Sequence, residues 1–572
     1  MCIIRSFRRA TSGNVAMIFA LTLPVIVVVT GMAVDTSQVE EAKWSLQSSA
    51  DAAALGAAKQ FGKTQNPVEL EKWAKSIFFA NEGRDDTDTR FTYEGVTRVA
   101  GNNVLRVTAT RDVPTYFGSA VKAVTGGKVD LETWHLSVAS EVIVANRTVE
   151  LALVLDNSGS MQSPPVGGTT PKITTLRDAS EKLVKQMLAA YPQANSTDPV
   201  RISVVPFAAS VNVGTNNATA SWMDVAGLSP SNSDDFDWSS ATLSTVKSKF
   251  SIFAALSLRN SNWKWGGCVQ SRPLGYAVTD DPPSLNTPAT FFVPFLAPSE
   301  YNWTGSLSSV KNDYLPTSAG TDDAKSLAAQ KNVSRYFNLL STADFSKKGP
   351  NNGCTTAAIT PLTATQTTAL NAVKGMIANG GTNIGEGLAW GWRTLTSGQP
   401  FAEGRARNTK ENLKVIVLMT DGENTYNAAY TSGEQIELTN ANKSQFGTYG
   451  YGQYLGTDGK IHAGRMFDAT RTTSPKANIT SITAAMNETM SITCENIKKD
   501  GKNDEGGDGI VIFSIAFDLK DGSPIKDRLR NCASNGIDGK GSKLYYDAKN
   551  SNDLLLAFSA ITDEISALRI SR

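Results

Sequence analysis

The pattern of hydrophobic residues is strongest near the N-terminus. Residues 15–34 form a run of 20 residues without a charged side chain. A helix of that length, at about 1.5 Å per residue, spans roughly 30 Å, which is the thickness of the hydrocarbon layer of a membrane. Beyond this run, apolar residues recur at spacings of three and four. This spacing predicts one continuous helix over residues 35–60 and a second helix over residues 68–80.

The hydrophobic period then changes from that of a helix to that of a strand. Apolar and polar residues alternate over residues 90–95, 104–109 and 136–144, and this alternation predicts three strands. We therefore expect residues 35–146 to form a small α+β module that is built on the extended membrane helix.

From residue 147 onward, short apolar strands alternate with helical patterns. The predicted strands cover residues 151–155, 201–206, 210–213 (a short antiparallel edge strand), 414–420, 510–517 and 543–546. The predicted helices cover residues 173–190, 364–378, a segment that begins at Ile384, and 552–568. Strands that alternate with helices imply an α/β fold with a doubly wound, mainly parallel sheet.

Two insertions interrupt this α/β pattern. Residues 214–360 carry five of the ten tryptophans and two cysteines. A loop of that length without structure is uncommon in a compact domain, so we expect a subdomain stapled by a disulfide. Residues 424–477 are rich in Tyr, Gly, Asn and Thr. The insertions either contribute to a ligand-binding face or elaborate the surface without such a role.

Composition and charge narrow the function. With 572 residues and 41% hydrophobic content, the chain can bury a large core in two or three domains. The net charge of +1 and the lack of a basic stripe argue against nucleic-acid binding. Arginines precede the apolar run and acidic residues follow it, so the positive-inside rule predicts a cytoplasmic stub over residues 1–14, a transmembrane helix over residues 15–34, and export of the rest.

A cleaved signal peptide is the alternative to this membrane anchor. Residues 31–33 (Gly-Met-Ala) fit a small-x-small cleavage site. The apolar run is longer than the 7–15 residues usual in a signal peptide, and the helical pattern continues across the site. Both observations favour the anchor.

The segment Asp156-Asn157-Ser158-Gly159-Ser160 follows directly on the apolar run 151–155. Alternate residues of an extended chain point the same way, so Asp156, Ser158 and Ser160 can converge on one cation. Carboxylate and hydroxyl oxygens suit Mg²⁺ or Mn²⁺ rather than zinc. The sequence therefore suggests a site for a hard divalent cation at this strand end.

Two later segments strengthen this interpretation. They are Gly-Gly-Thr-Asn-Ile-Gly (380–385) and the strand-turn that ends in Thr-Asp-Gly (415–422). Together with the first loop they resemble the von Willebrand factor A (vWA) domain and its metal-ion-dependent adhesion site. The resemblance implies that Mg²⁺ (or Mn²⁺ or Ca²⁺) is held, directly or through water, by Asp156, Ser158, Ser160, Thr382 and Asp421. The alternative is three unrelated turns that happen to contain Ser, Thr and Asp.

The cysteines are placed as expected for an exported chain. Cys2 lies on the predicted cytoplasmic side, whereas four cysteines follow the membrane segment, where disulfides persist. Proximity in the inferred fold favours the pairs Cys268–Cys354 and Cys494–Cys532. Zinc is the rival explanation, but no two cysteines have C-x₂₋₄-C spacing, and both histidines are far from any cysteine in the sequence.

The N-terminus also resembles one protein family. Gly-Asn-Val-Ala (13–16) leads into the apolar run, Ala-Val-Asp (33–35) ends it, and Asp-Ala-Ala-Ala-Leu (51–55) follows in the next helix. These segments, with Gly-Cys-Val (267–269) and Trp-Gly-Trp-Arg (390–393), resemble TadE/TadG-like proteins of bacterial Flp pilus assembly. The resemblance implies a protein anchored in the bacterial inner membrane, with its bulk in the periplasm, that serves a tight-adherence pilus system.

One position departs from the pilins that such systems process. Prepilin-peptidase substrates carry Glu five residues after the glycine that is cut, and here that position is Ile18. Cleavage by that peptidase is therefore not expected.

These observations favour a binding protein over an enzyme. Five protein oxygens leave one coordination position of Mg²⁺ open, and an Asp or Glu of a protein partner would fill it. We expect the partners to be pilus or secretion components, with no nucleic acid and no small-molecule substrate; the alternative is a membrane-anchored vWA adhesin or receptor for an extracellular ligand. A hydrolase would need a general base, and Glu423 is the only candidate near a metal motif.

Overall fold

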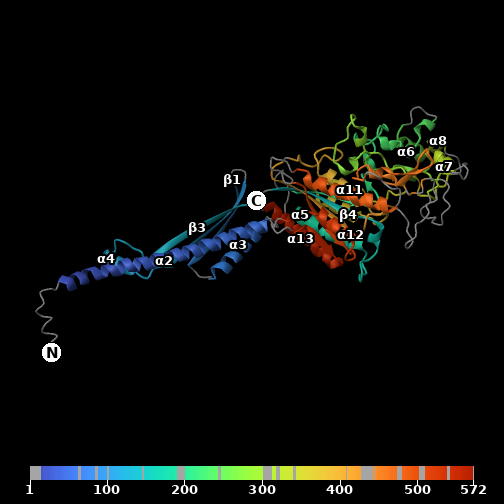
Figure 1. Cartoon of the computed structure of the whole chain (residues 1–572). Coiled ribbons are helices and arrows are strands. Elements are labelled where there is room, and N and C mark those ends of the chain that lie inside the picture. The colour runs from blue at the N-terminus through green and yellow to red at the C-terminus, as the bar shows by residue number, and fades with distance from the viewer. Residues whose placement is uncertain are drawn as a thin grey trace. The chain divides into compact units, whose positions relative to one another are not determined.

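The computed structural model of the protein is shown in Figure 1. It describes residues 14–61, 66–83, 88–99, 102–144, 147–189, 200–241, 247–300, 312–316, 323–338, 343–407, 409–426, 442, 444, 446–472, 479–501, 509–536 and 542–570. The predicted cytoplasmic stub, apart from Asn14, lies outside these residues, and so does Cys2. The chain divides into two compact units, Met1–Asn146 with Ser566–Arg572, and Arg147–Ile565.

The first unit is built on one long helix, α2 (Asn14–Phe61, 48 residues), which joins the predicted membrane segment to the predicted helix 35–60 without a break. Among the described residues it is the one helix with the length and hydropathy to cross a membrane. Side chains of its apolar part, such as Leu21 and Val29, are exposed, whereas Leu46 and Ala50 are buried. The same helix therefore changes from a surface suited to lipid to a surface covered by protein.

The second half of α2 packs against α3 (Pro67–Glu82) and an antiparallel sheet with the order β1-β2-β3, as Figure 1 shows. The strands are β1 (Thr89–Val99), β2 (Asn102–Pro114) and β3 (Thr133–Val144), and the short helix α4 (Gly118–Val124) follows β2. Small residues on α2 permit the close approach: a Cβ on Gly56 would lie 2.2 Å from Cδ1 of Ile77 on α3.

A carboxylate fastens the start of α4 to α2 where the apolar run ends. The oxygens of Asp35, which is buried, accept the backbone N–H groups of Tyr116 at 2.8 Å and Phe117 at 2.9 Å. A Cβ on Gly31, one helical turn earlier, would lie 2.4 Å from the ring of Phe117. The helix and the link to α4 are therefore in direct contact at this level.

The second unit is built on an eight-stranded sheet with the order β15-β14-β9-β4-β5-β6-β7, and β8 also pairs with β5. Five strands are parallel: β4 (Thr148–Asp156), β5 (Val200–Phe207), β9 (Asn412–Thr420), β14 (Val511–Phe517) and β15 (Tyr545–Ala548). The short strands β6 (Val211–Asn212), β7 (Cys268–Val269) and β8 (Thr360–Thr363) are antiparallel. The predicted α/β fold class with a mainly parallel sheet is confirmed.

Helices cover this sheet, as Figure 1 shows for α5, α11, α12 and α13 around β4. Ala152 and Val154 of β4 share one core with Leu388 of α10 and Met490 of α11, and strand alternation turns Leu153 to the opposite side. The helix bounds are α5 (Lys172–Ala189), α9 (Gln366–Lys374), α10 (Ile384–Thr394), α11 (Ile479–Lys499), α12 (Pro524–Cys532) and α13 (Ser551–Ile570). Helix α9 is shorter than the predicted 364–378, and β15 begins two residues later than predicted.

Both insertions have structure of their own. In the first, α6 (Lys249–Ser257), α7 (Asp323–Lys331) and α8 (Ser334–Phe337) join 3₁₀ turns around an aromatic core. In the second, two hairpins form from β10 (Phe446–Gly447) with β11 (Gly450–Tyr451), and from β12 (Gln453–Leu455) with β13 (Ile461–Ala463).

Two disulfides cross-link this unit. They join Cys268 to Cys354 and Cys494 to Cys532, which are the pairs that the sequence favours. Cys532 is the last residue of α12, and Cys494 lies inside α11. A sulfur in a disulfide has no thiolate to give to a metal, so zinc is excluded for these four residues.

Candidate metal site at the strand ends

The predicted metal ligands lie on loops at the carboxyl ends of neighbouring strands. Strand β4 ends at Asp156, and its parallel neighbour β9 ends at Thr420, just before Asp421. Thr382 lies in the loop that leads into α10. Because parallel strands place their carboxyl ends at one edge of the sheet, the fold brings loops that are more than 200 residues apart in sequence to the same edge.

Hydrogen bonds join four of the five predicted ligands in one network. The buried carboxylate of Asp156 accepts the backbone N–H of Ser158 at 2.7 Å and the hydroxyl of Thr420 at 2.6 Å. The hydroxyls of Ser158 and Ser160 are 2.9 Å apart, and Ser160 donates to Oδ1 of Asp421 at 2.7 Å. These oxygens therefore lie close together on two loops.

The fifth residue, Thr382, lies beside this network. Its hydroxyl and that of Ser160 flank Gly422, where a Cβ would be 3.8 Å from Oγ1 of Thr382 and 3.9 Å from Oγ of Ser160. Its backbone N–H donates to Oγ1 of Thr425 at 2.8 Å, and its carbonyl accepts the N–H of Thr425 at 2.9 Å. The main chain thus fixes Thr382 without using its hydroxyl.

Main-chain bonds also lock the loops to one another. The N–H of Gly159 donates to the carbonyl of Gly380 at 2.8 Å, and the N–H of Asn379 donates to the carbonyl of Asn157 at 2.7 Å. The loop after β4 and the loop before α10 therefore hold their positions through backbone contacts, independently of the serine and threonine hydroxyls.

Burial disfavours the charged form of the Asp156 carboxylate. Loss of solvent, followed by the charge of Asp421, raises the pKa of Asp156 to about 7. One cation partly offsets these charges: Nζ of Lys172, the first residue of α5, lies 2.9 Å from Oδ2 of Asp421 and 3.1 Å from Oδ2 of Asp518. Asp156 itself accepts hydrogen bonds from Ser158 and from the hydroxyl of Thr420.

Sequence reasoning missed three members of this site: Thr420, Lys172 and Asp518. A signal for Asp518 was present, because it follows the apolar strand β14 in the way that Asp156 follows β4 and Asp421 follows β9. No comparable signal marks Lys172, which reaches the site from the start of a helix.

The donor set suits a hard divalent cation. It consists of two carboxylates and three hydroxyls, which are the oxygen ligands that Mg²⁺, Mn²⁺ and Ca²⁺ prefer. Within the described part of the chain, no group of three or more His, Cys, Asp or Glu side chains is arranged to hold a metal. Any metal at the strand ends would therefore depend on the hydroxyls as well as on Asp156 and Asp421.

The N-terminus provides the informative comparison with known families. Residues 13–60 match the family described as "Putative Flp pilus-assembly TadE/G-like". The N-terminal segment of this chain is TadE/G-like. The match covers nearly all of α2 and ends there, so the TadE/G-like segment includes both the exposed apolar part and the buried part of the helix. No curated protein matches this sequence.

Three solved structures show a distant likeness to this chain. The pilus adhesin SpaC from Lactobacillus rhamnosus GG has 12% identity and a TM-score of 0.29, over 84% of this chain and 34% of SpaC. The vWF domain of the type V pili tip protein Mfa5 from Porphyromonas gingivalis has 11% identity and a TM-score of 0.31, over 74% of this chain and 97% of that domain. The pilus adhesin RrgA from Streptococcus pneumoniae has 10% identity and a TM-score of 0.31, over 84% of this chain and 49% of RrgA. This chain spans about a third of the length of SpaC.

Proposed function

We propose that this protein is a membrane-anchored envelope protein of tight-adherence (Flp/Tad) pilus assembly. Its vWA domain would bind one Mg²⁺, Mn²⁺ or Ca²⁺ and, through the metal, a carboxylate of a protein partner. The observation that carries the proposal is the packing of two carboxylates and three hydroxyls around the ends of β4 and β9. The TadE/G-like segment supports the pilus context.

Each residue has a distinct role in this proposal. Asp156, Ser158, Ser160, Thr382 and Asp421 would hold the cation, which supplies a positive centre with an open coordination position. Asp156 and Asp421 provide the negative charge. Thr420 orients Asp156 through its hydroxyl, and Lys172 holds the second oxygen of Asp421. Without a histidine among these groups, the arrangement suits binding rather than hydrolysis.

The proposed organisation follows the predicted boundaries. Residues 1–14 would be cytoplasmic, residues 15–34 would cross the inner membrane, residues 35–146 would form the periplasmic TadE/TadG-like module, and residues 147–572 would form the vWA domain with insertions at 214–360 and 424–477. Two disulfides suit an oxidising compartment outside the cytoplasm. The unbroken helix α2 supports an anchor, because signal cleavage after residue 33 would cut within that helix.

Calorimetry on the full-length protein tests the metal site. After EDTA treatment and removal of the chelator, we expect one Mn²⁺ or Mg²⁺ to bind per chain. Asp156→Ala should abolish this binding, whereas Asp527→Ala, which removes an exposed carboxylate of α12, should not change it. Equal metal affinity in all three proteins would contradict the proposed site.

A pull-down tests the partner. Capture of pilus components from envelope extracts should disappear with EDTA and return with Mg²⁺. If the metal binds as proposed but capture and pilus output do not depend on it, the metal has a structural role alone. Capture of an extracellular ligand with unchanged pilus output would favour the adhesin alternative.

A further inference from the structure

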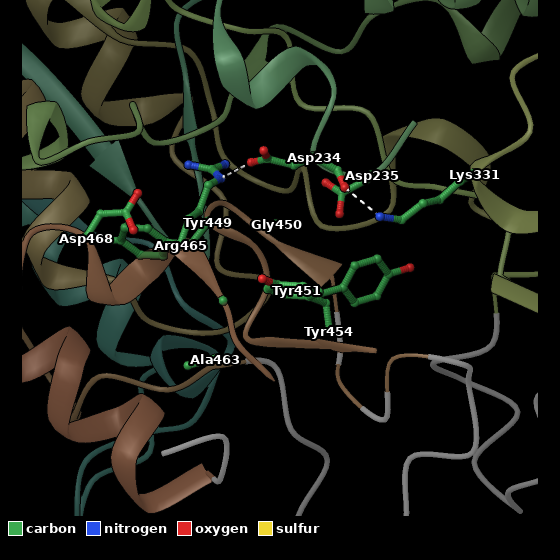
Figure 2. Close-up of a pocket in the computed structure, with 11 residues that line it drawn as sticks. Asp234, Asp235, Lys331, Tyr449, Gly450, Tyr451, Tyr454, Ala463, Arg465 and Asp468 are labelled. Atoms are coloured by element: carbon green, nitrogen blue, oxygen red, sulfur yellow. Dashed lines mark hydrogen bonds and ion pairs between the residues drawn. The ribbon is translucent and has the colours of Figure 1, made fainter. Parts of the chain in front are cut away.

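A second site lies away from the five proposed metal ligands, between the two insertions. A cavity of about 270 Å³ opens there, and Figure 2 shows side chains that converge on it from both insertions. Aspartates and cations of both segments line it, together with tyrosines of the second insertion. A volume just below ~300 Å³ suits a ligand smaller than most drug-sized molecules.

The most informative group in this cavity is the carboxylate of Asp235. The residue is 5% exposed, and among the described residues no donor forms a hydrogen bond with its Oδ2. The carboxylate lies over Gly450, where a Cβ would be 3.4 Å from Oδ2. This oxygen is itself covered from solvent, so a ligand in the cavity meets the carboxylate at the small part of Asp235 that stays exposed, where the group can accept a hydrogen bond.

The other charged groups of the cavity already have partners. Nε of Arg465 lies 2.9 Å from Oδ2 of Asp234, and Nζ of Lys331 donates to the backbone carbonyl of Asp234 at 3.0 Å. Oδ2 of Asp468 accepts the backbone N–H of Leu274 at 3.2 Å. Figure 2 shows the pair Arg465–Asp234 at the rim of the cavity.

Charges of both signs surround the cavity. Three carboxylates, Asp234, Asp235 and Asp468, face the cations Arg465 and Lys331. The buried ammonium of Lys249 adds a third cation near Asp235. A charged ligand of either sign would meet like charges in the lining, so the cavity favours a neutral ligand that both donates and accepts hydrogen bonds.

The tyrosines add a flat apolar surface. The hydroxyl of Tyr451 accepts a hydrogen bond from Gln330 at 2.7 Å, so its ring is held in place. Tyr454 is 42% exposed, and its ring stacks on that of His462 with the centroids 5.5 Å apart. An exposed aromatic face beside polar groups suits a ligand with one apolar face and a rim of hydroxyls.

We propose that this cavity binds a single pyranose ring, as a free sugar or as the end of a glycan. The carboxylate of Asp235 accepts a hydrogen bond from a sugar hydroxyl, Arg465 and Asp234 lie beside the neighbouring hydroxyls, and the ring of Tyr454 covers the C–H face of the sugar. This binding does not depend on the proposed metal site, because none of these residues belongs to it.

Saturation-transfer NMR on the full-length protein tests the inference with methyl pyranosides of glucose, galactose, mannose and N-acetylglucosamine. The detergent must carry no sugar headgroup. We expect at least one pyranoside to bind with a dissociation constant of about 1 mM or tighter. Asp235→Asn and Tyr454→Ala should each weaken binding about tenfold or more, whereas Tyr116→Ala, which removes an exposed tyrosine of the first unit, should have no effect.

Three controls keep the test decisive. Thermal unfolding should show that both pocket variants fold, because Tyr454 is exposed and the Asp235 change neutralises a buried charge. Binding should persist in EDTA and in Asp156→Ala. The inference is overturned if no pyranoside binds, if the pocket variants bind normally, if a charged probe such as lysine or phosphate binds instead in an Asp235-dependent way, or if EDTA removes the sugar.

Discussion

The strand-end loops and the insertion cavity are both organised around a buried aspartate, but the two aspartates differ in their partners. Asp156 accepts a backbone N–H and a hydroxyl, from groups within its own loop and the adjacent strand end. Asp235 has an oxygen that receives no hydrogen bond from the described residues, and the segment it faces is more than 200 residues away in sequence.

This difference separates two ways of preparing a binding site. At the strand ends, hydrogen bonds fix Asp156 and Asp421 in advance. What these carboxylates still lack is enough positive charge to balance them. In the cavity, positive charge is already present in Arg465, Lys331 and Lys249, and the remaining deficit is one hydrogen-bond donor. The first site therefore suits a cation and the second a neutral hydroxyl.

Removal of a disulfide should have the largest effect, and this effect is on the free energy of unfolding. Replacement of Cys268 and Cys354 by Ser opens a loop of 86 residues, and replacement of Cys494 and Cys532 opens one of 38. Chain entropy predicts losses of ~4.5 and ~4 kcal/mol in the free energy of unfolding. Because Cys268 packs with Phe446 and Tyr451 beside the cavity, only the first pair should weaken pyranoside binding. Denaturant titration and NMR measure the two effects, and equal loss of sugar binding in both variants would contradict the distinction.

Removal of Asp156 should have the largest effect on the metal site. Asp156→Ala takes away a carboxylate and leaves mostly hydroxyls to face a divalent cation. We expect the affinity for Mn²⁺ to fall at least about a hundredfold, roughly 2.7 kcal/mol, while pyranoside binding stays normal. Calorimetry measures the first and saturation-transfer NMR the second. A parallel loss of both would mean that the two sites are coupled or that the variant is unfolded.

Thr382→Ala should give a smaller loss at the same site. Its backbone bonds to Thr425 do not need the hydroxyl, so the loop should keep its conformation. We expect metal affinity to fall about tenfold, near 1.4 kcal/mol. Thr382→Ser, which keeps the hydroxyl, is the matched control and should bind nearly as the wild type does. If the Ser variant were as weak as the Ala variant, the methyl group rather than the hydroxyl would matter.

The smallest expected effect is a gain, rather than a loss, in affinity for the metal. Lys172→Met removes a positive charge beside Asp421, so a divalent cation should bind several-fold more tightly, by about 1 kcal/mol. Without metal the variant should be less stable, because Asp421 and Asp518 lose their cation. Lys185→Met, on the exposed face of α5, controls for the loss of a lysine. Unchanged metal affinity would show that Lys172 does not compete with the metal.

The fold and the strand-end loops could be predicted because their signals are local. Each loop follows an apolar strand, and parallel pairing then places Asp156 and Asp421 at one edge regardless of the sequence between them. Helix α2 was predictable for the same reason, since its periodicity is continuous. The same rule points to Asp518, which directly follows the apolar strand β14.

The cavity could not be predicted in this way. Asp235 lies in an irregular segment and Gly450 in the two-residue strand β11, so neither has a hydrophobic period around it, and their contact depends on how two insertions pack. Lys172 is similar, because nothing near it in sequence indicates that its ammonium group reaches Asp421 and Asp518. Smaller errors, such as the late start of β15, arise because Lys543 pairs with Asn535 in an isolated bridge before the strand begins.

The continuity of α2 has a mechanical consequence. The helix is about 72 Å long at 1.5 Å per residue, and no proline interrupts it after residue 24. Asp35 clamps the start of α4 to this shaft at the level where the apolar run ends. With the apolar part anchored as proposed, a roll or tilt of that part would be transmitted along α2 as torque to the β1–β3 module.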